Sequence, residues 1–279
     1  MGKMAKPKQK IAVVYMVAGS SSRFEGKIKQ FAQVGPRGET LIEIAVQQAI
    51  KAGFNEIIFI VGEKTEEPFK EKFKAGYMNV PIFYAKQDFN HEERDRPWGT
   101  AQALVAAKEV VTSSFVVCNG DDIYGEKAMR TAYKFLLESK DETECCAVGY
   151  EVARVLPKKG KNNRAVFSTD KKGYVTNIKE IFEIEKDKLA EKGLTPKTLV
   201  SCNLFALKES VLEMFSERFE EFKKAHKGDR KIECLLPNEL GELIKEKKIK
   251  MKLLSTTDKM LGVTNPDDEE NVRKALIKK

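Results

Sequence analysis

Apolar runs and amphipathic stretches alternate along the first half of the chain. Short runs with the β-branched and aromatic content of buried strands cover residues 11–17, 56–61, 80–85 and 115–118. Apolar positions at helical spacing predict helices over residues 40–52, 66–74, 100–110 and 127–138. Gly53 is a typical end for the first of these helices. Strands separated by helices of this length predict an α/β fold with a mostly parallel sheet built from βαβ units.

The second half has more strand character, which predicts a mixed sheet beside the first. Strand patterns cover residues 144–152, 165–168, 175–184, 199–207 and 250–255. Helical patterns cover residues 210–224, 238–247 and 267–277, and either Asn265 or Asp267 can cap the last one. No repeat or linker rich in Pro and Gly divides the chain. We therefore predict a basic tail over residues 1–9 and one domain over residues 10–279, with halves at 10–140 and 141–279.

The end of the first predicted strand is the most informative junction. The apolar run over residues 11–18 breaks at Gly19 and continues into serines at positions 20–22. Small residues leave backbone N–H groups open to an anion, and cations just beyond can neutralise a polyphosphate. Those cations are Arg23, Lys27 and Lys29. Because open α/β sheets bind ligands at the carboxyl ends of their strands, the junction predicts a phosphate-binding loop. An ordinary strand-to-loop turn with surface cations is the alternative.

Two familiar phosphate-binding motifs do not fit this loop. A P-loop has four residues between its glycines and then Lys followed by Ser or Thr. Here residues 20–25 separate Gly19 from Gly26, and Ile28 follows Lys27. A dinucleotide fingerprint needs Gly-x-Gly-x-x-Gly leading directly into a helix. Position 21 is Ser and the next helical pattern begins at residue 40, so that motif is a poor match as well.

Composition and charge narrow the class of protein. The chain has 279 residues, 42% hydrophobic and 33% charged, which is typical of a globular protein with a sizeable core. Its net charge of +8 suits an anionic ligand, but the charge is diffuse and no stripe of alternating basic and aromatic residues predicts nucleic-acid binding. The apolar run at 11–18 is too short to span a membrane, so we expect a cytoplasmic protein with no membrane partner.

Cysteine and histidine usage limits the chemistry. The chain has five cysteines without metal-like pair spacing, and Cys145 and Cys146 are adjacent within a strand pattern, which favours buried, reduced thiols. The two histidines, His91 and His226, both stand among charged neighbours. A zinc site or a Ser-His-Asp hydrolase is therefore not expected.

Four further segments carry groups suited to ligand binding. Residues 119–122 (Asn-Gly-Asp-Asp) present two carboxylates after a glycine turn, which suits Mg²⁺, although a turn that caps the next helix is an equal alternative. Residues 96–101 (Arg-Pro-Trp-Gly-Thr-Ala) combine a proline, an aromatic ring and a glycine, and can form a platform for a flat base. Gln87 ends a strand and can pair with the edge of a base or be solvated. Residues 262–265 (Gly-Val-Thr-Asn) alone indicate little.

Together, these segments resemble the sugar-1-phosphate nucleotidylyltransferase family from about residue 10 to residue 279. The matching segments are 18–23, Lys29-Gln30, 35–40, 97–101, 120–122 and 262–265. The resemblance implies a Rossmann-like nucleotide-diphospho-sugar transferase fold, with the nucleotide-binding half first and the sugar-phosphate-binding half second. It implies an enzyme of the EC 2.7.7 type that joins a nucleoside triphosphate to a sugar 1-phosphate and releases pyrophosphate. Uridylyltransferases and thymidylyltransferases are the most similar members, which favours UTP or dTTP.

The resemblance also implies roles for particular residues. The nucleotide contacts are expected at Ala18, Gly19, Ser20, Ser21, Ser22, Gln87, Pro97, Gly99 and Thr100. The catalytic residues are expected to be Arg23, Lys29 and Asp121, and the Mg²⁺ ligands Asp121 and Asn265, with Asp268 as a competing choice for the second ligand. The sugar-phosphate contacts are expected at Gly149, Glu180 and Asn203, where packing roles are an equal alternative.

Three departures from the family pattern leave other functions open. Ser21 and Glu25 replace loop glycines, and Ile181 follows Glu180 where the family often has Lys or Arg. Lys179, before Glu180, alternates to the face of the strand opposite to that of Glu180. The alternatives are transfer to a non-sugar phosphate such as phosphocholine, or a regulatory protein that binds nucleotide sugars and has weak activity. The family includes monomers, dimers and tetramers, so a homo-oligomer is also open.

Overall fold

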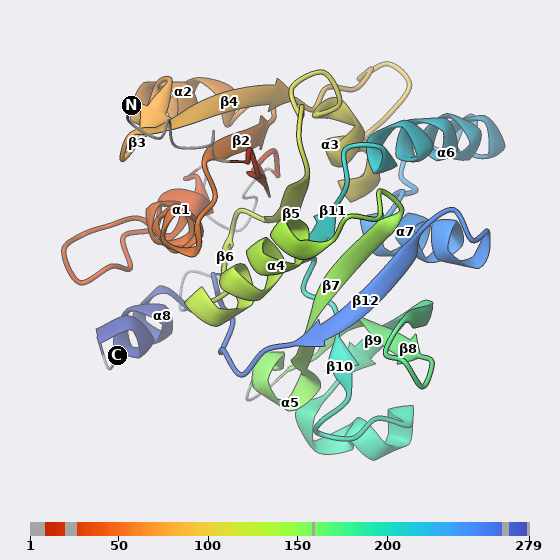
Figure 1. Cartoon of the computed structure of the whole chain (residues 1–279). Helices are drawn as coiled ribbons and strands as arrows, with labels where there is room; N and C mark the ends of the chain where they lie inside the picture. Colours follow the sequence, from red (N-terminus) through yellow and green to blue (C-terminus); the bar gives the residue numbers. More distant parts are fainter. Residues whose placement is uncertain (1–8, 20–26, 158–159, 264–267, 278–279) are drawn as a thin grey trace, which may run out of the picture.

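The apolar runs of the first half pair as parallel strands in the middle of one sheet. The computed structural model describes residues 9–19, 27–157, 160–263 and 268–277. In it, β1 (Ala12–Met16) lies between β2 (Glu56–Val61) and β5 (Phe115–Asn119), and β4 (Val80–Lys86) pairs with β2, all in parallel (Figure 1). β2 is buried along its whole length because helices cover both faces, which explains the apolar run from Ile57 to Val61. The predicted parallel core is confirmed.

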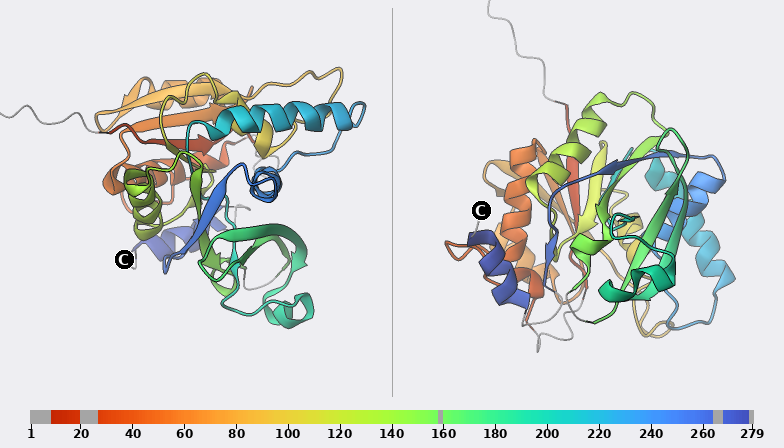
Figure 2. Two further views of the ribbon diagram at one scale, coloured as in Figure 1. Left: turned by 45° about the vertical axis from the view of Figure 1, so that its right-hand side comes forward. Right: turned by 90° about the horizontal axis from the view of Figure 1, so that it is seen from below.

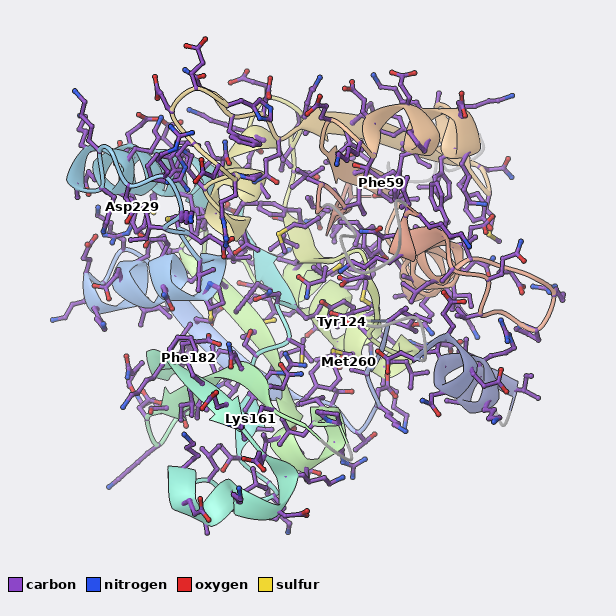
Figure 3. All side chains as sticks on the ribbon, turned by 180° about the vertical axis from the view of Figure 1, so that it is seen from behind. Phe59, Tyr124, Lys161, Phe182, Asp229 and Met260 are labelled. Atoms are coloured by element: carbon purple, nitrogen blue, oxygen red, sulfur yellow. The ribbon has the colours of Figure 1, made fainter. Side chains whose placement is uncertain are left out.

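The second half extends the same sheet, mostly with antiparallel strands. The complete sheet has 11 strands, in the order β3-β4-β2-β1-β5-β11-β7-β10-β8-β9, with β12 pairing in parallel with β7. β3 (Gly76–Tyr77), from the first half, pairs antiparallel with β4 at one edge. The second half adds β7 (Glu144–Glu151), β8 (Asn162–Thr169), β9 (Val175–Ile184), β10 (Leu199–Val200), β11 (Phe205–Leu207) and β12 (Lys250–Ser255). Lys161, just before β8, and Phe182 of β9 mark this extension, away from Phe59 of β2 (Figure 3). The predicted mixed pairing of the second half is confirmed, but its strands continue the first sheet and do not form an additional one.

Helices cover both faces of the sheet (Figures 1 and 2). One face packs against α1 (Leu41–Ala52), α2 (Glu66–Phe73) and α4 (Glu126–Glu138). The other packs against α3 (Thr100–Ala106), α6 (Val211–Ala225) and α7 (Leu236–Lys245). The shorter helices and the last helix are η2 (Lys29–Phe31), α5 (Val152–Val155), η3 (Lys186–Lys192) and α8 (Asp268–Ile277). Of the helices described, none has the length and apolar character to cross a membrane. The division of the chain into a tail and one domain stays a prediction.

Helix α1 shows how local sequence sets an element's ends. The Thr40 N–H donates to Glu43 Oε2 at 2.8 Å and the Thr40 side chain accepts the Glu43 N–H, so a capping box closes the first turn. Gly53 follows the last turn at φ +123°, a backbone conformation that residues other than glycine rarely adopt. The predicted range, 40–52, therefore matches the helix closely.

The segment predicted as one strand over residues 199–207 is two strands, so that prediction is wrong. β10 pairs with β7 and β8, whereas β11 pairs with β5 and β7. Between them Asn203 takes φ +59°, a left-handed conformation that ends a strand. Asn tolerates this conformation better than most residues, and the resulting bend carries residues 201–203 into a pocket described below.

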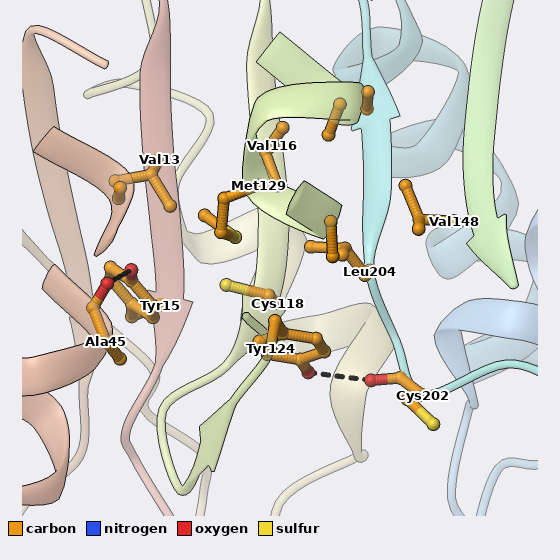
Figure 4. Close-up of a cluster of buried hydrophobic side chains, with 14 of the residues drawn as sticks. Val13, Tyr15, Ala45, Val116, Cys118, Tyr124, Met129, Val148, Cys202 and Leu204 are labelled. Atoms are coloured by element: carbon orange, nitrogen blue, oxygen red, sulfur yellow. Dashed lines mark hydrogen bonds between the residues drawn. The ribbon is translucent and has the colours of Figure 1, made fainter. Parts of the chain in front are cut away.

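Buried tyrosines tie the sheet to the loops at its carboxyl edge. The Tyr15 hydroxyl donates to the Ala45 carbonyl of α1 at 2.9 Å, and the Tyr124 hydroxyl donates to the Cys202 carbonyl at 2.6 Å (Figure 4). The same Tyr124 oxygen accepts the Asn119 N–H at 3.0 Å. Tyr124 therefore holds the end of β5 and the bend between β10 and β11 together.

All five cysteines are free and buried, in accord with the sequence. Burial raises the pKa of each thiol: Cys118, Cys145, Cys146, Cys202 and Cys234. Because the thiolate is the reactive form, we expect a disulfide reagent such as DTNB to label the native protein very slowly at pH 8. After the protein is unfolded in guanidinium without added reducing agent, all five thiols should react with DTNB. Rapid labelling of the native protein would contradict this packing.

Candidate active site

The carboxyl ends of β1 and β5 meet where the strand order of the sheet reverses. β2 lies on one side of β1 and β5 on the other, and Met16 pairs with Asn119. Such a reversal opens a crevice beyond the strand ends, where open α/β sheets bind ligands. Gly120 donates its N–H to the Met16 carbonyl at 3.0 Å, and a Cβ there would lie 2.2 Å from Val17 Cγ1. Glycine is therefore needed for the turn that delivers Asp121.

Lys29 and Asp121 form an ion pair beside this crevice. Lys29 Nζ lies 2.5 Å from Asp121 Oδ2, and the two side chains are 24% and 26% exposed. η2, which carries Lys29, and the turn after β5 are far apart in sequence, and packing brings them together. Lys29 was expected to bind phosphates and Asp121 to bind Mg²⁺, and the structure places the two side by side. The expected partners Ser20, Ser21, Ser22 and Arg23, and also Glu25, lie outside the described residues.

The two carboxylates of the 119–122 segment have different surroundings. Asp122 is half-buried and accepts a hydrogen bond from Asn119 Nδ2 at 2.9 Å, while Asn203 Nδ2 donates to Asn119 Oδ1 at 3.2 Å. Burial, with the nearby charge of Asp121, raises the pKa of Asp122 to about 7. The two neighbouring carboxylates therefore differ in their partners: Asp121 pairs with Lys29, and Asp122 belongs to a polar network with Asn119 and Asn203.

A two-stranded sheet joins the C-terminal motif to this segment. β6 (Asp122–Ile123) pairs with β13 (Leu261–Gly262), and Gly262 lies opposite Asp122. A Cβ on Gly262 would lie 2.3 Å from Asp122 Oδ1, which explains the glycine. The Val263 N–H also bonds the Asp121 carbonyl, at 3.3 Å. Residues 262–263 therefore adjoin the acidic turn, while Asn265 lies outside the described residues.

The donor chemistry at Asp121 suits magnesium. Mg²⁺ commonly takes one or two protein carboxylates and completes its octahedral shell with water and substrate phosphates. Asp121 offers one such carboxylate at the crevice. Across the described ranges, no three His, Cys, Asp or Glu side chains form a group that could hold a metal ion by themselves. Asp268 begins α8.

A cleft of about 800 Å³ opens beside the ends of β1, β2 and β4. Of the residues expected to bind nucleotide, Ala18, Gly19, Gln87, Pro97, Gly99 and Thr100 line it. Other lining residues were not predicted from the sequence: Glu63, Lys64, Asp88, Phe89, His91 and Glu233. Glu63 and Lys64 could have been found, since they follow β2 as Gly19 follows β1. Glu233 could not, because only tertiary packing brings it to this edge.

Gln87 is held in one orientation by its neighbours. Its Nε2 donates to the Gly99 carbonyl at 3.0 Å and to Gln102 Oε1 at 3.2 Å. Gln102 Oε1 also accepts the Trp98 N–H at 2.8 Å, and Gln102 Nε2 donates to the Asp88 carbonyl at 2.6 Å. Both amide groups therefore have only one satisfactory assignment, which leaves Gln87 Oε1 as a hydrogen-bond acceptor.

Trp98 does not act as the expected platform for a base. Its ring packs edge-on against Phe219 and Phe222 of α6, with centroids 6.3 and 6.1 Å away. The Arg94 guanidinium lies 3.6 Å from its ring centroid. A half-buried apolar ring is more stable against the core than in an aqueous cleft, so the interpretation of residues 96–101 is corrected at this position. Gly99, at φ +95°, keeps the backbone within reach of Cys234.

A second pocket, of about 160 Å³, adjoins this cleft. Its walls include the expected sugar-contact residues Glu180 and Asn203, together with Arg164 and Asp122. Burial raises the pKa of Glu180, and the positive charge of Arg164 opposes that rise. Thr100, Asn119 and Leu235 line both pockets, so the two share a wall. Gly149 lies in β7, where a Cβ would meet Leu253 Cδ1 at 3.0 Å, and neither described lining includes it.

Three solved structures share this architecture. A protein described as a glucose-1-phosphate thymidylyltransferase from Bacillus anthracis, solved with sucrose, superposes with a TM-score of 0.67 at 15% identity, covering 95% of both chains. The inositol-1-phosphate CTP transferase from T. maritima has a TM-score of 0.65 at 14% identity, covering 98% of this chain and 96% of that one. A UDP-glucose pyrophosphorylase complexed with UDP-glucose has a TM-score of 0.65 at 16% identity, covering 97% of this chain and 99% of that one. At such identities the likeness shows the fold.

Sequence comparison identifies the family. No curated protein sequence gives a significant match. The profile of a family described as nucleotidyl transferase, however, matches residues 16–239. That range contains the crevice between β1 and β5, the Lys29–Asp121 pair and most of the lining of both pockets. The chain therefore belongs to the nucleotidyl transferase family.

Proposed function

We propose that this protein is a Mg²⁺-dependent nucleotidylyltransferase that joins UTP or dTTP to a sugar 1-phosphate. The products are a nucleotide sugar and pyrophosphate. The observation that carries the proposal is the shared wall of the two pockets, because a transferase must bring two substrates into contact. The larger cleft takes the nucleotide and the smaller pocket takes the sugar phosphate.

The chemistry needs no histidine. An ionised oxygen of the sugar phosphate attacks the α-phosphorus of the triphosphate and forms a new P–O bond. The bond from the α-phosphorus to the oxygen that bridges to the β-phosphorus breaks, and that oxygen leaves with pyrophosphate. No proton has to be removed from the nucleophile, so catalysis rests on in-line positioning and charge stabilisation. A bound Mg²⁺ ion supplies positive charge at the phosphates.

Lys29 and Asp121 perform the charge-handling steps in this proposal. Asp121 holds the metal ion through its carboxylate. Lys29, now 2.5 Å from that carboxylate, is close enough to turn toward a bound phosphate. Lysine suits this exchange because its ammonium is a compact charge on a flexible stem. Arg23 and the residues 18–22 loop are assigned to the triphosphate on the family pattern.

Gln87 selects the base in this proposal. Its Nε2 is already bonded within the protein, so its Oε1 is the atom left to meet a base. An acceptor pairs with the ring N–H of uracil, thymine or guanine. Cytosine and adenine present an unprotonated ring nitrogen at that place. Gln87 Oε1 and this nitrogen are both acceptors, so no hydrogen bond can form between them. This polarity supports UTP or dTTP and leaves GTP as a competitor.

We therefore expect kcat/KM for UTP or dTTP to exceed that for CTP and ATP by about tenfold or more, the scale of one mismatched hydrogen bond. In Gln87→Met this preference should shrink to about threefold or less. Gln47→Met is the matched control. It removes from α1 an amide that donates to the Tyr77 hydroxyl, and it should keep the preference for UTP or dTTP. An undiminished preference in Gln87→Met would remove Gln87 from base selection.

The activity is tested by measuring pyrophosphate release with Mg²⁺. UTP, dTTP, GTP, CTP and ATP are each combined with glucose 1-phosphate, other sugar 1-phosphates, inositol 1-phosphate and phosphocholine. Release with a sugar 1-phosphate supports the proposal. A folded protein that releases none with any pair would sink it and favour the binding or regulatory alternative.

The smaller pocket argues against phosphocholine as the acceptor. A quaternary ammonium group is usually bound by aromatic rings. The described residues that line this pocket include none: they are Thr100, Asn119, Asp122, Asn163, Arg164, Ala165, Glu180, Ser201, Cys202, Asn203, Leu235, Pro237 and Met260. Their amide, hydroxyl and carboxylate groups suit the hydroxyl groups of a sugar.

A further inference from the structure

Arg164 of β8 occupies the strand position opposite Ile181 of β9. The two strands are antiparallel, and Arg164 and Ile181 are direct partners in their register. Residues directly opposite each other in such a pair project from the same face of the sheet. Arg164 lines the smaller pocket, so β8 supplies a cation there although position 181 of β9 carries none.

The Arg164 guanidinium is held in place but not neutralised. Its Nη1 donates to Asn162 Oδ1 at 3.2 Å and to the Asn163 carbonyl at 3.1 Å. Its Nε is buried without a hydrogen-bond partner in the described structure. No described carboxylate lies within ion-pair distance of it. A buried N–H of a charged group lowers the stability of the protein when it has no acceptor. The site therefore suits a ligand that brings a hydrogen-bond acceptor.

The charge of Arg164 reaches several walls of the smaller pocket. Burial is the largest cause raising the pKa of Asp122, of Glu180 and of the Cys202 thiol, and Arg164 opposes the rise in all three. These groups come from β6, β9 and the bend after β10. The Arg164 charge lowers the pKa of groups on all three elements, so the guanidinium lies among them. It forms no ion pair with Asp122 or Glu180.

We infer that Arg164 is the cation that binds the phosphate of the second substrate, and that it replaces the basic residue absent at position 181. A guanidinium presents planar N–H donors that match phosphate oxygens, and Nε is one of them. Glu180 and Asn203 then face the uncharged part of that substrate. The identity of this ligand as a sugar 1-phosphate rests on the proposed function; the anion site itself rests on Arg164.

Direct binding tests this assignment. Calorimetry on the full chain compares glucose 1-phosphate, glucose and inorganic phosphate in wild type, Arg164→Met, Arg164→Lys and the control Arg154→Met. Arg154 is an arginine of α5 that pairs with Glu151 outside both pockets. We expect Arg164→Met to weaken glucose 1-phosphate binding by about tenfold to a hundredfold and to raise its KM, with the KM for nucleotide unchanged. Arg164→Lys should lose less, and Arg154→Met nothing.

A rescue variant separates a phosphate contact from a structural role. Adding Ile181→Lys to Arg164→Met should recover at least part of the lost affinity, because it returns a cation to the same face from the neighbouring strand. If Arg164→Met does not fold, Arg164→Gln gives the same comparison. Unchanged binding in the neutral variant, or an equal loss of affinity for glucose and glucose 1-phosphate, would overturn the assignment.

Failure of the proposed function would have a different signature. If the wild type releases no pyrophosphate with any substrate pair but binds inorganic phosphate in a way that depends on Arg164, the sugar-transfer proposal fails and the anion site stands. If an active wild type gives the same KM for sugar phosphate as Arg164→Met, the anion site fails and the proposed function stands.

Discussion

Asp121→Asn is expected to lower kcat/KM for nucleotidyl transfer by about a hundredfold or more while the fold is retained. Asparagine keeps the shape of the side chain but removes the charge that faces Lys29 at 2.5 Å and that is assigned to the metal ion. The variant should also need a higher Mg²⁺ concentration for half-maximal rate. Pyrophosphate release, measured across a Mg²⁺ series, reports both effects.

A matched surface substitution controls for loss of charge alone. Asp141 is also paired with a lysine, Lys250, at 3.4 Å, but it lies on the exposed surface away from both pockets. Asp141→Asn should leave the rate and the Mg²⁺ requirement unchanged, since exposed ion pairs contribute little. If Asp121→Asn behaved in the same way, Asp121 would have no part in catalysis.

Phe59→Ala is expected to lower the free energy of unfolding by about 3–5 kcal/mol. Phe59 is wholly buried in β2, and its ring centroid lies 5.0 Å from those of both Phe69 and Phe73. Tyr15 and Tyr84 complete its surroundings at 6.0 and 6.1 Å. Alanine would leave a cavity bounded by α2 and three strands, which can close only partly. Urea denaturation at constant pH measures the change.

Phe83→Ala is the matched control for that cavity. Phe83 lies on the neighbouring strand β4 and is 42% exposed, so its removal should cost less than about 1 kcal/mol. The urea m-value should be similar for both variants, which keeps the comparison between free energies valid. An equal loss in the two variants would mean that the aromatic cluster around Phe59 contributes no special packing.

Local sequence was sufficient to predict the bounds of a strand where its apolar positions keep one regular period. The strands at residues 56–61, 175–184 and 250–255 have the predicted bounds, because a run buried on one or both faces carries its own signal. The failures lie where one residue breaks a pattern, as Asn203 does between β10 and β11. Short pairs such as β6 with β13 were also missed, since two residues carry no periodicity.

In the candidate site, too, some residues could be predicted from the sequence and others could not. The segments with Gly19, Gln87 and Asp121 could be found because each follows a strand and carries groups suited to a phosphate, a base or a metal ion. Trp98 and Arg164 could not be assigned, because the role of a side chain depends on what packs against it. Trp98 packs against α6, and Arg164 faces a pocket in which no carboxylate of the described residues is in ion-pair contact with it.

Periodicity and motifs at strand ends were enough to predict the parallel core, most helices and the family. Which residues meet was known only once the chain was folded. The tertiary structure brought Lys29 to Asp121, separated the roles of Asp121 and Asp122, turned Trp98 into the core and left Arg164 facing a pocket. The physical reason is that burial and contact between distant segments arise from packing, which no local pattern encodes.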